Sequence, residues 1–226
     1  MDLEIIGGSG PAPGSRLAVD PTFGAARVGI RPLDYGLAGL GGKILGHYRA
    51  SMMTGLTTGI AANGAILSLR WADTVRLFVP TRIQVGCAIT TAFTAAQALD
   101  AEAIIARAFT ASDTGGTAIL LTNDQQKMRG IMGSSLVTDL RVATTAALGA
   151  GTRTLDGVGI GITSFPNTNG LGSGSSLVDL YAFSAYHHPP AIALNEGLIV
   201  RLPTAQGAVG VVKYYLVLEW AEVAAI

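Results

Sequence analysis

Residues 212–220 alternate between two sets of side chains, and this pattern constrains the fold more than any other feature of the chain. The apolar set is Val212, Tyr214, Leu216, Leu218 and Trp220. The other set mixes polar and apolar residues: Lys213, Tyr215, Val217 and Glu219. A period of two places alternate residues on opposite faces of a β-strand, so this segment predicts a strand with one face in a core.

From Lys43 onward the chain consists of short apolar or alternating runs, separated by Gly, Asn, Thr and Pro. Such spacing is typical of an antiparallel sandwich or barrel. The run at 99–109 also fits a helix, because it is rich in Ala, Glu and Arg; its flanks favour a strand. Strands are expected at 44–49, 65–71, 74–80, 81–89, 99–109, 117–122, 136–144, 152–164, 177–186, 197–202 and 212–220. We predict an all-β, antiparallel, jelly-roll-like β-sandwich over residues 43–226.

Glycine and proline mark the expected connections. Asn63-Gly64 is a turn signal, and Pro80 indicates a bulge, an edge or a break. The loop 203–210 is expected to join the last two strands as a hairpin with a long connection. The glycines within 157–161 are expected to let a strand bend or approach another backbone. The glycine- and serine-rich stretch 167–176 is expected to be an exposed, mobile loop.

Residues 1–42 differ from the rest of the chain, with GGSGPAPG at 7–14 and LAGLGG at 37–42. This composition favours an irregular or extended path. Two interpretations stay open: a disordered leader, and an N-terminal arm laid across a neighbouring subunit. The segment 27–31 alternates and can pair as an edge strand. The first residues lack the basic and apolar regions of a signal peptide, so we expect synthesis in the cytoplasm.

Charged residues make up only 13% of the chain, whereas 49% is hydrophobic. An ordinary soluble domain carries about a quarter charged residues. A lone monomer would therefore struggle to cover itself with polar groups, and we expect much of its surface to be buried against other chains. The net charge is +0 and the cations are scattered, which argues against a nucleic-acid partner. No apolar run is long enough for a spanning helix, so no membrane partner is expected.

The sequence shows no catalytic or metal-binding constellation. Cys87 is the single cysteine, and we interpret it as a small buried hydrophobe on a strand. The histidines are His47, His187 and His188. Their spacing does not suit a zinc site, and no phosphate loop, dinucleotide fingerprint or nucleophile elbow is present. Asp100 and Glu102 share one strand face, but a solvated sheet edge explains them equally well. We expect no enzyme activity and no cofactor.

Charged side chains interrupt several of the expected strands. They are Arg70, Arg76, Arg82, Arg107, Arg141, Arg201 and Glu219. An exposed strand face explains them, because a long Arg stem covers apolar surface while its guanidinium reaches a carboxylate. The alternative is pairing between subunits. The acceptors would be Asp73, Asp100, Glu102, Asp139 or Glu219.

Five stretches resemble virion structural proteins of tailed bacteriophages. They are FGAARVGIRPLDY (23–35), GHYRASMMTGLTTGIAANGAILSLRWAD (46–73), TRIQVGCAITTAFTAAQ (81–97), ARAFTASDTGGTAILLT (106–122) and NEGLIVRLPTAQGAVGVVKYYLVLEWAEV (195–223). The resemblance covers most of the chain and contains no catalytic motif. It implies a capsid decoration (cement) protein with a compact β-fold. Such a protein sits on the capsid surface of the virion, binds the major capsid protein of its phage and commonly forms a homotrimer.

On this hypothesis, the N-terminal arm and the apolar strand faces supply the contacts. The candidate inter-subunit contacts are Arg27, Ile30, Arg31, Tyr35, Arg70, Arg76, Arg201 and Tyr215. One alternative is a tail or baseplate subunit. A second is a carbohydrate-binding β-sandwich, with Tyr181, Tyr186 and the loop 167–176 as its stacking platform. A third, a cupin-like metalloenzyme, is disfavoured by the histidine spacing.

Overall fold

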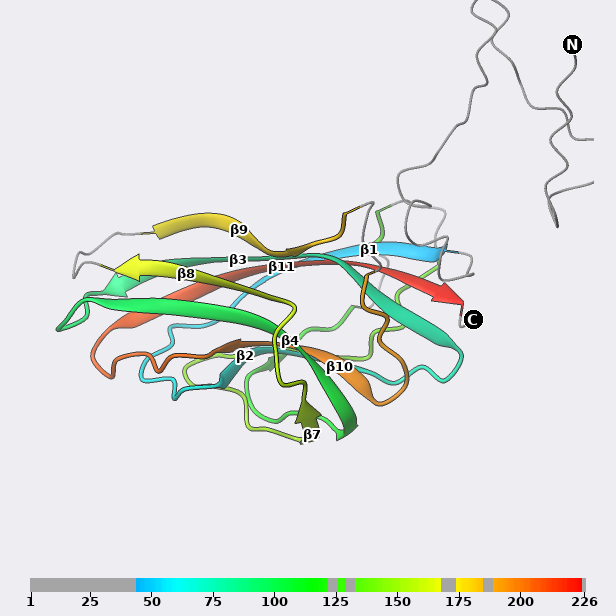
Figure 1. The fold of residues 1–226 in the computed structure, drawn as a ribbon, viewed down its shortest axis with the longest axis horizontal. Helices are drawn as coiled ribbons and strands as arrows, with labels where there is room; N and C mark the ends of the chain where they lie inside the picture. Colours follow the sequence, from blue (N-terminus) through cyan, green and yellow to red (C-terminus); the bar gives the residue numbers. More distant parts are fainter. Residues whose placement is uncertain (1–43, 122–125, 129–132, 168–173, 185–188, 225–226) are drawn as a thin grey trace, which may run out of the picture. The chain divides into compact units, whose positions relative to one another are not determined.

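The computed structural model describes residues 44–121, 126–128, 133–167, 174–184 and 189–224. Within these ranges the regular elements are all β-strands (Figure 1). They are β1 (Ile44–Met53), β2 (Gly64–Trp71), β3 (Arg76–Thr91), β4 (Gln97–Ala111), β5 (Thr117–Ala118), β6 (Asp139–Val142), β7 (Thr152–Leu155), β8 (Gly161–Asn167), β9 (Gly174–Ala182), β10 (Glu196–Leu202) and β11 (Val211–Ala224). The ambiguous run 99–109 is therefore a strand, as favoured from its flanks.

The first sheet has four antiparallel strands in the order β1-β11-β3-β9. Its central strand β11 contains the alternating segment from which the fold was predicted. The apolar residues of that segment are at most 1% exposed. Tyr215 on the opposite face is 38% exposed. The predicted strand with one buried face is confirmed.

The second sheet has the order β5-β6-β2-β10-β4, with two further strands beyond β4. Both β7 and β8 pair with the edge of β4 that β10 leaves free. Ala103 pairs with Val200 of β10 on one side and Gly161 of β8 on the other. Ala106 pairs likewise with Gly197 of β10 and Leu155 of β7. One edge of β4 thus carries β8 along its first half and β7 along its second.

Eight of these strands are divided between the two sheets in jelly-roll order. The first sheet takes β1, β3, β9 and β11, and the second takes β2, β4, β8 and β10. Each sheet inserts a late strand between two early ones, giving β1-β11-β3-β9 opposite β2-β10-β4-β8, the nested arrangement of a double-sheet jelly roll. Figure 1 shows the two layers. The predicted antiparallel, jelly-roll-like sandwich is confirmed, and β5, β6 and β7 are additions to it.

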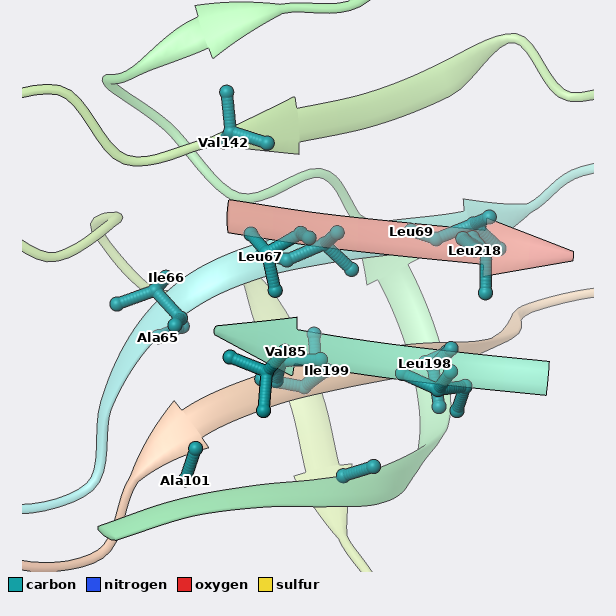
Figure 2. Close-up of a cluster of buried hydrophobic side chains, with 14 of the residues drawn as sticks. Ala65, Ile66, Leu67, Leu69, Val85, Ala101, Val142, Leu198, Ile199 and Leu218 are labelled. Atoms are coloured by element: carbon teal, nitrogen blue, oxygen red, sulfur yellow. The ribbon is translucent and has the colours of Figure 1, made fainter. Parts of the chain in front are cut away.

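The core lies between the two layers and draws side chains from both. Figure 2 shows Val85 and Leu218 of the first sheet in the same cluster as Leu69 and Leu198 of the second. At one end of the core, the ring of Trp220 lies between those of Tyr48 and Phe78, with centroid separations of 5.6 Å and 5.8 Å. Such contacts fill the inter-sheet space with large, rigid groups.

The face of the second sheet that points away from the first is also buried. Ile104 and Ile199 are register partners on that face, and both are 0% exposed. Figure 1 shows β7 and the connections between β4 and β8 beneath β2, β4 and β10. The chain therefore covers this outer face itself. The outer face of the first sheet is covered at Val79, Ala221 and Val223, which are 0% exposed, and carries exposed side chains further along the strands.

The two sheets approach closely where β8 meets β9. A Cβ atom added at Gly161 would overlap the carbonyl oxygen of Leu180, so only glycine fits. This confirms the expectation that a glycine within 157–161 lets a strand approach another backbone. The predicted strand 152–164 is nevertheless wrong as a single element. The turn at 156–160 divides it into β7 and β8, which continue along the same edge of β4.

Pro80 interrupts neither the strand nor the sheet. Residues 76–91 form one strand, β3, and the two strands expected on either side of Pro80 are joined. Glu219 pairs with Arg82 and Trp220 pairs with Pro80, so Thr81 is an extra residue on β3. Of the three interpretations offered for Pro80, the bulge is correct, because the additional residue lets the strand pass a position that has no N–H donor.

The predicted C-terminal hairpin is wrong. β10 lies in the second sheet and β11 in the first, so the loop 203–210 crosses between sheets. Buried Gln206 holds this crossing: its Nε2 donates to the carbonyl oxygens of Thr57 (2.8 Å) and Gly210 (3.2 Å). The turn at Asn63 is confirmed, with a left-handed φ of 63°.

Several predictions lie outside the described residues. They are the N-terminal arm 1–42 with its edge strand 27–31, the contacts Arg27, Ile30, Arg31 and Tyr35, the platform residue Tyr186, and His187 and His188. The expected loop 167–176 is described only at its ends. Asn167 is the last residue of β8, and residues 174–176 are the first residues of β9. The part of the loop that lies in the described ranges is therefore strand.

Candidate functional site

The carboxylates of the described residues are all engaged within the chain. Some pair with arginines on neighbouring strands, and others hold loops by accepting backbone or hydroxyl hydrogen bonds. They are Asp73, Asp100, Glu102, Asp113, Asp139, Asp156, Asp179, Glu196, Glu219 and Glu222. In the described ranges, no three His, Cys, Asp or Glu side chains gather as they would around a metal ion.

Three arginines expected to contact other subunits have structural roles in their own chain. The Arg70 Nε lies 3.1 Å from Asp139 Oδ2, and the Arg201 Nε lies 2.7 Å from Glu102 Oε2. At the start of β3, the backbone N–H of Arg76 donates to Asp73 Oδ1, and its carbonyl oxygen accepts from Trp71 Nε1. A role for these residues between subunits stays a prediction.

A buried ion pair, Arg153 with Asp113, was not anticipated from the sequence. Arg153 Nε donates to Asp113 Oδ1 at 2.9 Å, and its Nη2 lies 2.8 Å from Oδ2. The two side chains are 7% and 0% exposed. The guanidinium also lies over the ring of Phe109, 5.4 Å from the centroid. This pair joins β7 to the turn that follows β4 across 40 residues of sequence.

Glu222 is the second buried charge that the sequence did not reveal. Its Oε1 accepts hydrogen bonds from Ser135 Oγ (2.7 Å), the Leu136 N–H (2.9 Å) and Trp220 Nε1 (3.3 Å). Burial raises the pKa of this carboxyl, and the three donors and the charge of Arg76 only partly offset that effect. These hydrogen bonds thus link the segment before β6 to the end of β11.

Glu222→Gln is expected to remove a pH-dependent destabilisation. Because the pKa of Glu222 is raised in the folded state, its stabilising contribution is complete below the unfolded pKa of about 4.3 and is lost as pH rises through the folded value. The amide Oε1 of glutamine can keep the three hydrogen bonds. The variant should therefore gain stability relative to the natural protein between about pH 5 and pH 8, measured by urea unfolding.

The matched control for this experiment is Asp179→Asn. Hydrogen bonding from Arg82 lowers the pKa of Asp179, so its contribution is present above the unfolded pKa and disappears in acid. The pH trends of the two variants relative to the natural protein should have opposite signs. If the Glu222→Gln difference stays constant from about pH 5 to pH 8, the carboxyl is ionised throughout that range and this prediction is wrong.

The outer face of the first sheet carries four charges of alternating sign, one on each strand, which we call the charge ladder: Arg49, Glu219, Arg82 and Asp179. The Arg49 Nε lies 3.4 Å from Glu219 Oε1, and Arg82 binds Asp179 through two nitrogens at 2.7 Å and 3.3 Å. Glu219 and Arg82 are register partners on the two central strands. Arg49, Glu219 and Arg82 lie level across three strands, whereas Asp179 pairs with Gln84, so the Arg82–Asp179 pair runs diagonally between β3 and β9.

Exposed apolar side chains cross the same face next to the ladder; we call them the apolar row. Met53 of β1 pairs with Tyr215 of β11, which pairs with Gly86 of β3; Leu177 of β9 lies at the bulge opposite Gly86. Met53, Tyr215 and Leu177 are 53%, 38% and 42% exposed. Tyr215 was a predicted contact residue, but its neighbours in the row were not. The register between strands cannot be read from the sequence of one strand.

The described ranges contain only some of the residues named for the alternative sites considered from the sequence. Tyr181, proposed for a carbohydrate platform, is half-buried, and burial raises the pKa of its hydroxyl. His47 Nε2 lies 3.4 Å from Thr81 Oγ1. Cys87 is buried on β3, as interpreted. The described residues contain no helix that is long and apolar enough to span a membrane.

The fold and this face together define a jelly-roll β-sandwich protein with one outer sheet face covered by its own chain and one bearing exposed apolar side chains. Comparison with protein-family models, curated proteins and solved structures finds no match to this chain.

Proposed function

We propose that this protein is a structural component of a tailed-bacteriophage particle, where it decorates and stabilises the capsid shell as a homo-oligomer. The observation that carries the proposal is the jelly-roll sandwich with an exposed apolar row on one outer sheet face. Contiguous exposed apolar side chains commonly mark protein–protein contacts. The resemblance of the sequence to virion structural proteins supplies the viral setting, and the major capsid protein of the same phage is the proposed partner.

Many charged side chains are paired within the chain itself, which supports a binding role that depends on the burial of apolar surface. Seven arginines of the described residues pair with carboxylates of their own chain: Arg49, Arg70, Arg82, Arg107, Arg141, Arg153 and Arg201. Paired charges and a net charge of +0 limit mutual repulsion between identical copies crowded on a shell. A contact of about 1,000 Å² of apolar surface offers roughly 25 kcal/mol before the costs of association.

The test is binding to particles assembled from the same genome without this protein. Purified protein added to such particles is expected to sediment with the capsid and to raise the temperature at which the shell releases its DNA. Tails purified separately form the control. Binding to tails alone would establish the tail or baseplate alternative, and binding to neither would refute the proposal.

The N-terminal arm is tested in the same assay. Deletion of residues 2–42 is expected to lower the occupancy of the capsid if this segment reaches a neighbouring subunit. Unchanged occupancy and heat resistance would remove the arm from the mechanism and leave the sandwich as the binding element.

A further inference from the structure

We propose that one end of the sandwich is the surface through which copies of this chain associate, about a rotation axis that passes close to that end. The inference rests on the homo-oligomer in the proposed function, for which it names the contact. Strand β8 finishes at this end, and its arrowhead points there in Figure 1. We call it the uncharged end, and it consists of four connections: 54–63, 92–96, 143–148 and 203–210.

Hydrogen bonds and close packing join the four connections. Thr58 Oγ1 donates to the carbonyl oxygen of Ala208 at 2.7 Å, and the Thr58 N–H donates to that of Thr145 at 3.4 Å. A Cβ atom added at Gly210 would overlap the ring of Phe93. The connections thus form one surface whose backbone is held in place before any partner binds, which lowers the cost of association.

Polar and apolar side chains exchange their usual places at the uncharged end. Thr57 and Gln206 are 0% and 4% exposed, and they bind each other and the backbone. Leu56 and Val209, by contrast, are 53% and 56% exposed. Exposed apolar side chains above a buried polar layer are the arrangement expected of a surface that contacts other protein. Alanines of the four connections are exposed as well: Ala61, Ala62, Ala95, Ala96, Ala146, Ala205 and Ala208.

The sequence of the four connections contains no charged residue. Charges lie at the border instead, where Thr204 Oγ1 donates to the Asp100 carboxylate and Lys213 lies near the start of β11. An apolar centre with a polar rim is the usual composition of a protein interface. A strongly charged partner would lose hydration on this surface without gaining a counter-charge.

The lack of charge identifies the occupant as another copy of this chain. Close to a rotation axis, a side chain lies against the same side chain of the neighbouring copy, so a charge there would meet its own sign. An uncharged surface avoids this repulsion whatever the number of copies. Alanine is the commonest residue of the four connections, and its burial costs no side-chain entropy.

Contact with the opposite end of another copy is disfavoured by the charges gathered there. To cover these charges with an uncharged surface would cost their hydration and return no new pairing. Such a head-to-tail contact also risks an open chain of copies, whereas contact through the same end closes. The charged residues at the opposite end are Asp73, Arg76, Arg107, Asp156 and Glu196.

The experiment is light scattering coupled to size-exclusion chromatography of the purified protein at about 100 μM, a concentration well above the Kd of a specific oligomer, with circular dichroism to check the fold. Val209→Glu and Val209→Lys each place like charges against one another near the axis. Either variant alone is expected to be monomeric. An equimolar mixture of the two pairs opposite charges, and the mass of the natural oligomer is expected to return.

The matched control is the same pair of substitutions at Val158, which is 80% exposed on the turn between β7 and β8. These variants are expected to keep the natural mass, separately and mixed. A natural protein that is monomeric at about 100 μM overturns the proposal. So does an unaltered mass in the Val209 variants, and so does a mixture that fails to recover, because Val209 then does not face its own copy.

Two results would identify a different occupant, and each overturns the proposal. A monomeric natural protein in which deletion of residues 2–42 speeds hydrogen exchange at 203–210 would show that the N-terminal segment covers this end. A monomeric natural protein that loses capsid binding on Val209→Glu would show that the shell covers it. Because the mass is measured without particles, this inference can fail while capsid binding persists, and capsid binding can fail while the oligomer persists.

Discussion

Replacement of Trp220 by alanine is expected to lower the free energy of unfolding by about 3–5 kcal/mol. Trp220 is fully buried at the end of the core, between the rings of Tyr48 and Phe78, and its Nε1 donates to Glu222. Alanine would leave a cavity between rigid neighbours that have little room to collapse. It would also remove one of the three donors that hold the buried Glu222 carboxylate. Urea unfolding followed by circular dichroism measures the change.

Two further variants separate these effects. Trp220→Phe retains an aromatic ring between Tyr48 and Phe78, but it removes the donor to Glu222, and its loss should be smaller. Leu120→Ala removes a side chain that is 73% exposed and should change stability by less than about 0.5 kcal/mol. A loss below about 1 kcal/mol for Trp220→Ala would mean that this end of the core is loosely packed, contrary to the aromatic stacking described above.

Arg153→Met is expected to cost about 3–5 kcal/mol, because it leaves the Asp113 carboxylate buried without its counter-charge. The same change removes the contact of the guanidinium with the Phe109 ring. Asp113 would keep only the Gly151 N–H as a donor among the contacts described for it. The effect should persist in about 1 M salt, since buried pairs are screened little.

A double-mutant cycle tests whether the pair acts as a unit. Asp113→Asn keeps an acceptor for the Gly151 N–H but removes the negative charge. Combined with Arg153→Met, it should cost clearly less than the sum of the two single changes. As a control, Arg107→Met, which removes the solvent-accessible pairs of Arg107 with Asp156 and Glu196, should cost about 1 kcal/mol or less. Strict additivity at Arg153 and Asp113 would show that the charges do not interact.

Local patterns predicted most of the strands because side-chain alternation is a property of a short segment. The apolar set of β11 is buried wherever the strand pairs, since its own period places it on one face. Even the helix-compatible run at 99–109 is a strand, because pairing with β10 on one side and β8 on the other outweighs its modest helix propensity. The glycines at 157–161 marked the close approach for the same local reason.

Connections between strands were less predictable. The loop 203–210 has the composition of a hairpin loop, yet it carries the chain from one sheet to the other. What fixes that crossing is a contact with a distant residue, Thr57, through the buried side chain of Gln206. In this jelly roll the chain passes repeatedly between the sheets, and the hydrogen bonds that hold this crossing join residues 149 apart in the sequence.

The candidate face depends still more on tertiary structure. Tyr215 was among the contact residues predicted from the sequence, but its association with Met53 and Leu177 follows from the registers of three strand pairs. The charge ladder has the same origin: its members come from β1, β3, β9 and β11, and no two are neighbours in sequence. Backbone pairing brings Arg49, Glu219 and Arg82 level with one another and Asp179 diagonally next to Arg82, and only then does their alternation of sign exist.

The amino-acid sequence alone specified which segments are extended and which of their faces are apolar, because those properties arise from steric preferences and spacing within a few residues. Long-range contacts in the folded chain set which strands are neighbours, in what register, and which charges are buried. Their energies depend on segments far apart in the chain, and no local pattern contains them.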